Sequence, residues 1–258
     1  MASAVDPVLR MPELFDLTGR VAIVTGGTRG IGYAIAQGFI AAGAGVVIGG
    51  RKEDRCRSAA AELGGRAASV AVNMGDLAAA EALVDSAVAN FGRVDIVVNN
   101  AATAVNQPLG QMTAAAFDKV FAVNVRGPLM LVQAALPWLR EAPGASVINV
   151  ISPAVRMYAA DVALYASSKS ALLSLTRSMA EAFAADDVRV NALSPGPTDT
   201  NMLRTHSEEV QQATRDATLL RRIADPRELV APALFLATPA SSFMTGQVLT
   251  VDGGMVPC

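Results

Sequence analysis

Three side chains that could together move a proton lie between residues 152 and 169. Tyr165 and Lys169 are four residues apart, so on a helix they lie on one face, one turn from each other. Ser152 ends an apolar, β-branched run, SVINVIS, which predicts a buried strand. A strand that ends in a hydroxyl and leads into such a helix is typical of an open α/β sheet, in which ligands bind at the carboxyl ends of the strands.

The chemistry open to this trio is proton exchange with an alcohol or carbonyl oxygen. A free phenol has a pKa near ~10. An ammonium about 5 Å away, at an effective dielectric near ~20, favours the phenolate by roughly 3 kcal/mol. We therefore expect Lys169 to lower the pKa of Tyr165 by about two, into a useful range for an acid or base. Ser152 would hold the same oxygen. Because YxxxK is also common on surface helices, other parts of the chain must support this interpretation.

A glycine-rich turn near the start of the chain has the context of a phosphate site. The run RVAIVT at 20–25 predicts a strand, TGGTRGIG spans 25–32, and an apolar helix follows to about residue 42. Glycines let the backbone approach a pyrophosphate closely, and a helix N-terminus offers free N–H groups. The alternative is a tight strand–helix turn that binds nothing.

The residues after the second predicted strand favour NADP(H). The strand GVVIGG, at 45–50, is followed by Arg51 and Lys52, and Arg29 lies in the glycine turn. An NAD-specific site would place an acid here for the ribose hydroxyls, whereas guanidinium groups suit a 2′-phosphate. An exposed basic helix start is the alternative interpretation, and NAD(H) stays possible.

Strands and helices alternate along the rest of the chain. This alternation predicts a single domain over 1–258 with a Rossmann-type, doubly wound parallel sheet and helices on both faces. Asp76 is expected to cap one helix, and Asn124 to lie in a long helical region over 114–140. Residues 201–222 predict a polar helical flap, with apolar anchors at Met202, Leu203, Leu219 and Leu220. The further predicted strands span 66–73, 93–99, 188–193 and 247–251.

Composition excludes several classes of function. The net charge is −2, so the chain lacks the excess of basic residues that is typical of a nucleic-acid binder. Cys56 and Cys258 form no CxxC pair, and His206 is the only histidine, so we expect no disulfide, no metal site and a cytoplasmic protein. A lone histidine is more often a surface residue than a catalyst. Residues 1–16 are interpreted as a mobile arm without a signal peptide, and no membrane partner is expected.

Over residues 17–254 the chain resembles the short-chain dehydrogenase/reductases, including members similar to 3-oxoacyl-[acyl-carrier-protein] reductases. The matching motifs, in order, are TGGTRGIG, NNAA at 99–102, Asn124 in NVRG, the Ser152, Tyr165 and Lys169 set, PGPTDT at 195–200 and VDGG at 251–254.

The resemblance implies a role for each matching residue. Tyr165 would be the general acid/base, Ser152 would position the substrate oxygen, Lys169 would bond the nicotinamide ribose, and Asn124 would anchor a proton-relay water. Thr198 would hold the carboxamide of the cofactor. The other residues expected at the cofactor, besides Tyr165 and Lys169, are Gly26, Thr28, Arg29, Gly30, Ile31, Gly32, Arg51, Lys52, Asn73, Met74, Asn100, Ala101, Pro195, Gly196 and Thr200.

Three residues depart from the family pattern. Ala102 stands where a glycine is usual, Asn73 replaces an acid at the adenine pocket, and Pro153 stiffens the loop after Ser152. The family also implies a homotetramer, or a dimer, built on the helices that bear Asn124 and Tyr165.

The substrate stays open. A small carbonyl or alcohol compound is expected, either a 3-oxoacyl thioester or a free ketone, steroid or sugar. A carrier protein would want a basic docking surface, but residues 177–189 carry two bases and three acids, which argues mildly for a free molecule. A different class, an NADP(H)-sensing module without catalysis, is less favoured because the Ser, Tyr and Lys set is intact. The variable lining is expected in 102–109, 155–164 and 201–222.

Overall fold

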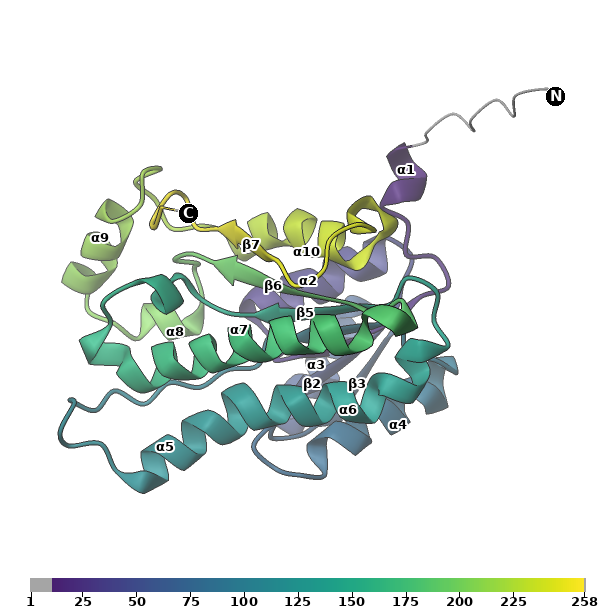
Figure 1. The fold of residues 1–258 in the computed structure, drawn as a ribbon, viewed down its shortest axis with the longest axis horizontal. Helices are drawn as coiled ribbons and strands as arrows, with labels where there is room; N and C mark the ends of the chain where they lie inside the picture. The colour runs from purple at the N-terminus through teal and green to yellow at the C-terminus, as the bar shows by residue number, and fades with distance from the viewer. Residues whose placement is uncertain (1–10, 258) are drawn as a thin grey trace.

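A computed structural model describes residues 11–257, so residues 1–10 of the predicted arm and Cys258 lie outside the described part. Its centre is a seven-stranded parallel sheet in the order β3-β2-β1-β4-β5-β6-β7. The predicted doubly wound fold is confirmed (Figure 1). The strands are β1 Val21–Thr25, β2 Gly45–Gly50, β3 Ala67–Ala71, β4 Ile96–Asn99, β5 Ser146–Val150, β6 Arg189–Pro195 and β7 Val248–Val251.

Helices cover both faces of the sheet because successive strand residues point to opposite sides and both sets are apolar. The larger helices are α2 Gly30–Ala41, α3 Glu53–Leu63, α4 Ala79–Phe91, α5 Ala114–Phe121, α6 Gly127–Arg140, α7 Ala163–Phe183, α9 Glu208–Asp216 and α10 Val230–Ala237. In β1, Val21 and Ile23 pack into one cluster, with α4, α6 and α7. Ala22 and Val24 pack into the other, with α2, α3 and α10. Short helices are α1 Met11–Leu14 and α8 Asn201–Arg204, and short 3₁₀ turns include Pro153–Arg156, Ala160–Val162 and Pro226–Leu229.

The predicted helical region over 114–140 is confirmed, with one addition. A π-helical turn, Ala122–Arg126, divides it, and Asn124 lies in that turn. One local expectation was wrong. Asp76 does not cap α4, which begins three residues later, after Ala78, without a side-chain cap. The Asp76 carboxylate instead accepts a hydrogen bond from Asn73 Nδ2 at 3.2 Å, because the chain makes a turn before the helix starts.

The segment Ala114–Arg140 is apolar and long enough to pass a length-and-composition test for a membrane span, with a mean hydropathy of 1.3 in its best window. Within the fold, α6 packs against α4, and the π-helical turn packs against α7. A core helix passes the same test, so the observation is weak evidence for a membrane.

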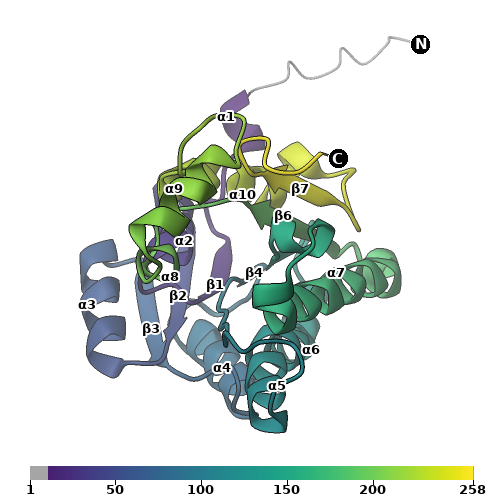
Figure 2. The same ribbon diagram turned by 90° about the vertical axis from the view of Figure 1, so that its left-hand side faces the viewer.

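The carboxyl ends of the strands meet at one edge, which faces the viewer in Figure 2. Two segments rise above that edge. One is α8 with α9, and the other is the stretch 153–162 that leads into α7 (Figure 2). The site lies at this edge.

Candidate active site

One large cavity of about 2260 Å³ runs along the carboxyl edge of the sheet. Typical small-molecule sites occupy roughly 300–1,000 Å³, so this cavity has room for two ligands side by side. Ser152, Tyr165 and Lys169 line it together with almost every predicted cofactor residue. Gly32 and Asn124 do not line it.

The glycine turn has the shape that a pyrophosphate needs. Gly26 and Gly30 both have positive φ, at 66° and 57°, which other residues rarely adopt. A Cβ added to Gly26 would lie 2.8 Å from Asn100 Nδ2, which itself donates to the Thr25 oxygen at 2.9 Å. The turn leads directly into the N-terminus of α2, where Arg29, the N-cap residue, makes no side-chain cap. This cradle therefore fits a dinucleotide phosphate.

Gly32 lies behind that cradle rather than on the cavity wall. A Cβ there would clash with Asn100 Nδ2 and the Gly26 oxygen. Its lack of a side chain lets α2 begin directly against the turn, so Gly32 supports the shape of the cradle without lining the cavity.

Four cations line the cavity near the end of β2. Arg29, Arg51 and Lys52 were predicted there, and Arg55, one turn into α3, joins them. None of the four makes an ion pair with any residue in 11–257. The sequence analysis missed Arg55, although its spacing of four residues from Arg51 was a usable signal.

The two acids in the first turn of the same helix bond Arg57 and do not face the cavity. Arg57 bonds Glu53 at 2.6 Å and Asp54 at 2.7 Å. Neither carboxylate lines the cavity. The cavity beside β2 therefore presents unpaired positive charge, as a bound phosphate requires.

The departures from the family pattern are compatible with the fold. Positive φ among described non-glycine residues occurs only at Asp187 and Arg221, so Ala102 avoids that conformation. Asn73 keeps an acceptor, since its Oδ1 accepts from Gly75 N at 3.2 Å. Pro153 is the first residue of a 3₁₀ turn whose N-cap is Ser152, and the Ser152 hydroxyl accepts from Ala154 N at 3.2 Å.

The other end of the cavity brings the predicted catalytic side chains together. Lys169 is buried, its Nζ donates to the Val150 oxygen at 2.7 Å, and it lies 5.7 Å from the centroid of the Tyr165 ring. Burial lowers the pKa of Lys169 to about 8. Placing an ammonium where water is excluded disfavours its charged form.

The expectation that Lys169 lowers the pKa of Tyr165 is wrong for the chain alone. Burial raises the pKa of Tyr165, and a hydrogen bond with Ser152 acts in the opposite, lowering direction. Desolvation of the phenolate thus outweighs the stabilising contacts of the protein. The phenol of the free chain is an acid that holds its proton at neutral pH.

Asn124 has all of its side-chain bonds within the protein. Its Oδ1 accepts from Thr103 N at 2.8 Å, while Nδ2 donates to the Thr103 oxygen and the Ser168 hydroxyl, both at 2.9 Å. Ser168, next to Lys169, was missed by the sequence analysis. These bonds tie the loop after β4 to α7. A relay water held by Asn124 would therefore have to donate a hydrogen bond to the main-chain carbonyl oxygen of Asn124.

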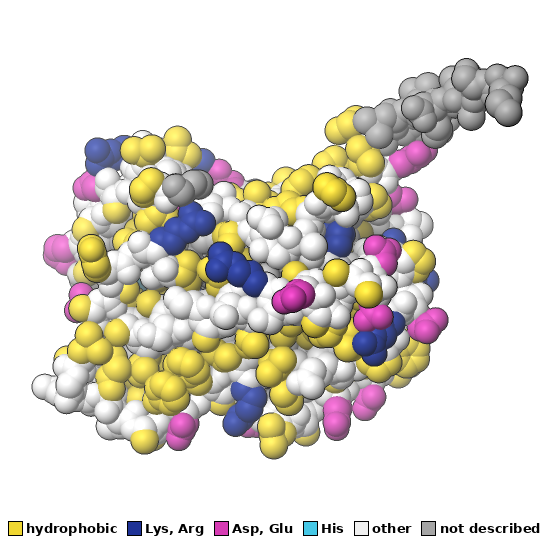
Figure 3. Space-filling view, in the orientation of Figure 1, with side chains coloured by type: hydrophobic (Ala, Val, Ile, Leu, Met, Phe, Trp, Pro, Cys, Tyr) yellow, Lys and Arg dark blue, Asp and Glu magenta, His cyan; other side chains and the backbone are white. Residues whose placement is uncertain are grey.

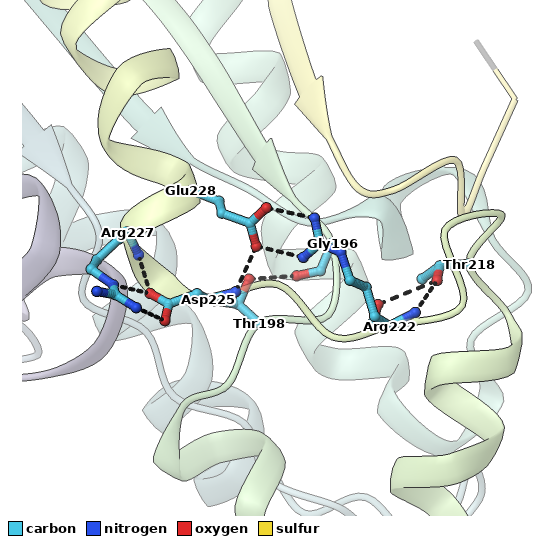
Figure 4. Close-up of polar contacts among 7 residues, drawn as sticks. All are labelled: Gly196, Thr198, Thr218, Arg222, Asp225, Arg227 and Glu228. Atoms are coloured by element: carbon cyan, nitrogen blue, oxygen red, sulfur yellow. Dashed lines mark hydrogen bonds and ion pairs between the residues drawn. The ribbon is translucent and has the colours of Figure 1, made fainter.

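The flap is anchored at its base by a polar network (Figure 4). Arg222 donates to both carboxylate oxygens of Glu228 at 2.6 Å, and Glu228 accepts from Asp225 N at 2.8 Å. Arg222 lowers the pKa of Glu228 to about 2. Thr198 Oγ1 donates to the Gly196 oxygen at 3.0 Å on the cavity side of this base.

The predicted apolar anchors of the flap were partly wrong. Leu219, Leu220 and Met202 are 81%, 61% and 46% exposed, while Thr218, next to Leu219, is buried. The Thr218 hydroxyl donates to the Arg215 oxygen at 3.0 Å and lies 3.3 Å from both N and O of Arg222. His206 lines the cavity, half-buried, so the structure brings it closer to the site than expected.

Comparisons with known proteins agree with this geometry. The family model described as Enoyl-(Acyl carrier protein) reductase matches residues 26–256. The chain is 35% identical over 244 residues to 7alpha-hydroxysteroid dehydrogenase of Escherichia coli K12, covering 93% of this chain and 95% of that one. It is 34% identical over 250 residues to galactitol 2-dehydrogenase of Agrobacterium fabrum, covering 92% and 98%. A solved structure, a blue fluorescent protein from a metagenomic library in complex with NADPH, is 35% identical with a TM-score of 0.87, covering 94% and 100%.

Proposed function

We propose that this chain, which belongs to the short-chain dehydrogenase/reductase family, interconverts a carbonyl and a secondary alcohol with NADP(H). Its relatives are named as dehydrogenases and reductases, which supports an oxidoreductase. Tyr165 is the general acid/base in this proposal. The observation that carries it is the meeting of Ser152, Tyr165 and Lys169 at one end of a cavity whose other end holds a phosphate cradle.

Each residue at that end has a distinct task. Bound NADPH supplies the hydride that is added to the carbonyl carbon and is thereby oxidised to NADP⁺, and the reverse reaction returns it. Tyr165 donates the proton to the resulting oxygen, for which its protonated state at neutral pH is suited. Ser152 holds that oxygen in place. Lys169, buried beside the Tyr165 ring, has the proposed task of bonding the nicotinamide ribose.

The preference for NADP(H) over NAD(H) rests on charge. Arg29, Arg51, Lys52 and Arg55 are unpaired within 11–257 and border one part of the cavity. Arg57 pairs with Glu53 and Asp54, the acids in the first turn of α3. Guanidinium groups pair with a 2′-phosphate in bidentate geometry. The NADPH complex of the related solved structure is compatible with this choice.

The assembly and location proposed here are those of a cytoplasmic homotetramer or homodimer. Hydrophobic side chains gather over α5 and the adjoining part of α6, next to α7, in Figure 3, and Phe117 and Trp138 are 46% and 36% exposed on α5 and α6. Contact between copies along these helices would bury that surface.

The deciding experiment measures NADPH consumption against ketones, aldehydes, quinones and 3-oxoacyl thioesters, with Tyr165→Phe as the control. We expect the variant to lose about 10²–10⁴-fold in turnover while it still binds NADPH. Undiminished turnover in Tyr165→Phe would refute the mechanism. Tight NADPH binding without any turnover would favour the alternative function, an NADP(H)-sensing module.

A further inference from the structure

Exposed hydrophobic side chains border the cavity near Ser152 and Tyr165. Met157 and Tyr158 come from segment 153–162, and Met202 and Val210 from α8 and α9. Met157 is 41% exposed, Met202 and Val210 are each 46% exposed, and Tyr158 is fully exposed. We call these four residues the apolar rim. Large apolar side chains left exposed around a concave site mark a surface that a ligand covers.

The lining of the same region is apolar and almost free of charge. Segments 153–162 and 201–214 together with Met255 contribute fifteen lining residues, of which eleven are apolar. Asp161 is the one charged residue among these fifteen, all within the described chain, and His206 is the one titratable base.

The arginines of these segments are directed elsewhere. Arg204 binds Asp199 through two hydrogen bonds of 2.7 Å, and Arg156 does not line the cavity. A phosphate, a carboxylate or a coenzyme A tail would want a cation at this end. Four cations, unpaired within the described chain, instead gather near β2, where the cofactor phosphate is expected, and Lys119 on α5 lines the cavity outside these segments.

From this contrast, and resting on the oxidoreductase function proposed above, we infer the substrate class: an uncharged, bulky alicyclic or aromatic ketone, or the matching secondary alcohol, with a fused-ring body. The reacting oxygen reaches Ser152 and Tyr165 while the ring body covers the apolar rim. Each rim side chain then loses exposed apolar area, which favours binding. A rigid ring system also loses little conformational freedom when it binds.

The same lining disfavours a polyol or sugar. Each sugar hydroxyl that leaves water needs a protein partner, and an unmatched one weakens binding. Four polar residues among fifteen offer few such partners. The two related dehydrogenases, named for a hydroxysteroid and for galactitol, represent the two classes between which this lining discriminates.

The first test compares three substrates with NADPH as reductant: 1-decalone, fructose and a 3-oxoacyl thioester of coenzyme A. Decalone and fructose have nearly equal numbers of heavy atoms, so size alone does not separate them. We expect kcat/KM for decalone to exceed that for either competitor by about 100-fold or more. Preference for fructose or the thioester would overturn the substrate class and leave the oxidoreductase function intact. Absence of turnover with every carbonyl would overturn both.

The second test removes the apolar rim. The double variant Met157→Ser/Met202→Ser should lower the ratio of kcat/KM for decalone to that for butanone by about tenfold, because only the larger ketone reaches the rim. Phe243→Ser is the matched control, since Phe243 is fully exposed and does not line the cavity, and it should leave the ratio unchanged. An unchanged ratio in a folded double variant, verified by circular dichroism, would overturn the inference.

Discussion

The Lys169 ammonium lies 5.7 Å from the centroid of the Tyr165 ring and is almost completely buried. Its Nζ donates to the Val150 oxygen at 2.7 Å, and the described residues provide no carboxylate partner for it. A buried cation with a single carbonyl partner destabilises the fold while it is charged. The charged Lys169 therefore lowers the free energy of unfolding while it places a cation beside Tyr165.

The first prediction is that Lys169 makes the stability of the free chain depend on pH. Its pKa is about 8 in the folded chain, against 10.5 for an ordinary lysine. The unfolded state therefore binds more protons between these values, and stability rises as pH increases from about 8 towards 10.5. Relative to Lys169→Met, the free energy of unfolding should rise by roughly 3 kcal/mol over this range. Urea unfolding at pH 7 and at pH 10 measures it.

Comparison with Lys169→Met removes the other groups that titrate in this range, including tyrosines. A difference in unfolding free energy that stays constant from pH 7 to pH 10 would show that Lys169 titrates normally in the folded chain.

The second prediction concerns the hydrogen bond between Ser152 and Tyr165. This bond lowers the pKa of Tyr165 against the raising effect of burial. Ser152→Ala should therefore raise the pKa of the phenol, and the alkaline limb of the pH profile for carbonyl reduction should move to higher pH. Loss of the oxygen-holding hydroxyl should also reduce kcat/KM by about 10²-fold or more.

Ser170→Ala is a suitable control for this experiment. Ser170 is on α7, the helix that bears Tyr165, and its hydroxyl donates to the main-chain oxygen of Ala166 at 3.0 Å instead of to the site. A pH profile of Ser152→Ala that matches the wild type in shape would refute the proposed contact.

The fold was predictable because its signals are local and repeated. Every predicted strand contains an apolar stretch, and strands alternate with helices, which leaves few topologies for a single sheet. The glycine turn was readable for the same reason, since Gly26 and Gly30 occupy backbone conformations that few other residues adopt.

What the sequence did not reveal depends on contacts between distant segments. The π-helical turn at Asn124 accompanies bonds to Thr103 and Ser168, and no periodicity within 114–140 reports those partners. The pKa of Tyr165 was assigned the wrong direction because burial, a property of the whole fold, outweighs one nearby charge.

The third prediction separates two arginines of α3 that carry the same charge. Arg55 lines the cavity unpaired within 11–257, whereas Arg57 is bound to Glu53 and Asp54. If Arg55 meets the 2′-phosphate, Arg55→Ala should raise the Kd for NADPH by about tenfold and leave the Kd for NADH nearly unchanged. Fluorescence titration without substrate measures both constants.

Arg57→Ala serves as the matched control on the same helix. It removes one charge as well, but from a residue outside the cavity, so we expect the Kd for NADPH to rise by no more than about threefold. Equal losses in the two variants would indicate a general field effect, and 0.5 M salt would then abolish the difference from wild type.

The fourth prediction addresses the base of the flap, where Glu228 accepts two hydrogen bonds from Arg222 and one from Asp225 N. Glu228→Gln removes the charge but keeps the shape. We expect faster amide exchange over 217–225 and a KM for the preferred ketone that rises by about threefold, with kcat less affected, because the loosened flap carries Met202 and Val210. Glu208→Gln is the control, since Glu208 pairs with Arg215 within the flap instead of at its base.

The same contact predicts how the wild-type flap responds to pH. The pKa of Glu228 is about 2. The stabilisation that the ionised Glu228 gives is therefore fully present above the ordinary carboxyl pKa and is lost as pH falls towards 2. Exchange rates over 217–225 should therefore stay slow down to about pH 4 once corrected for intrinsic exchange, and an early rise near pH 5 would show that the Arg222 contact does not hold the flap.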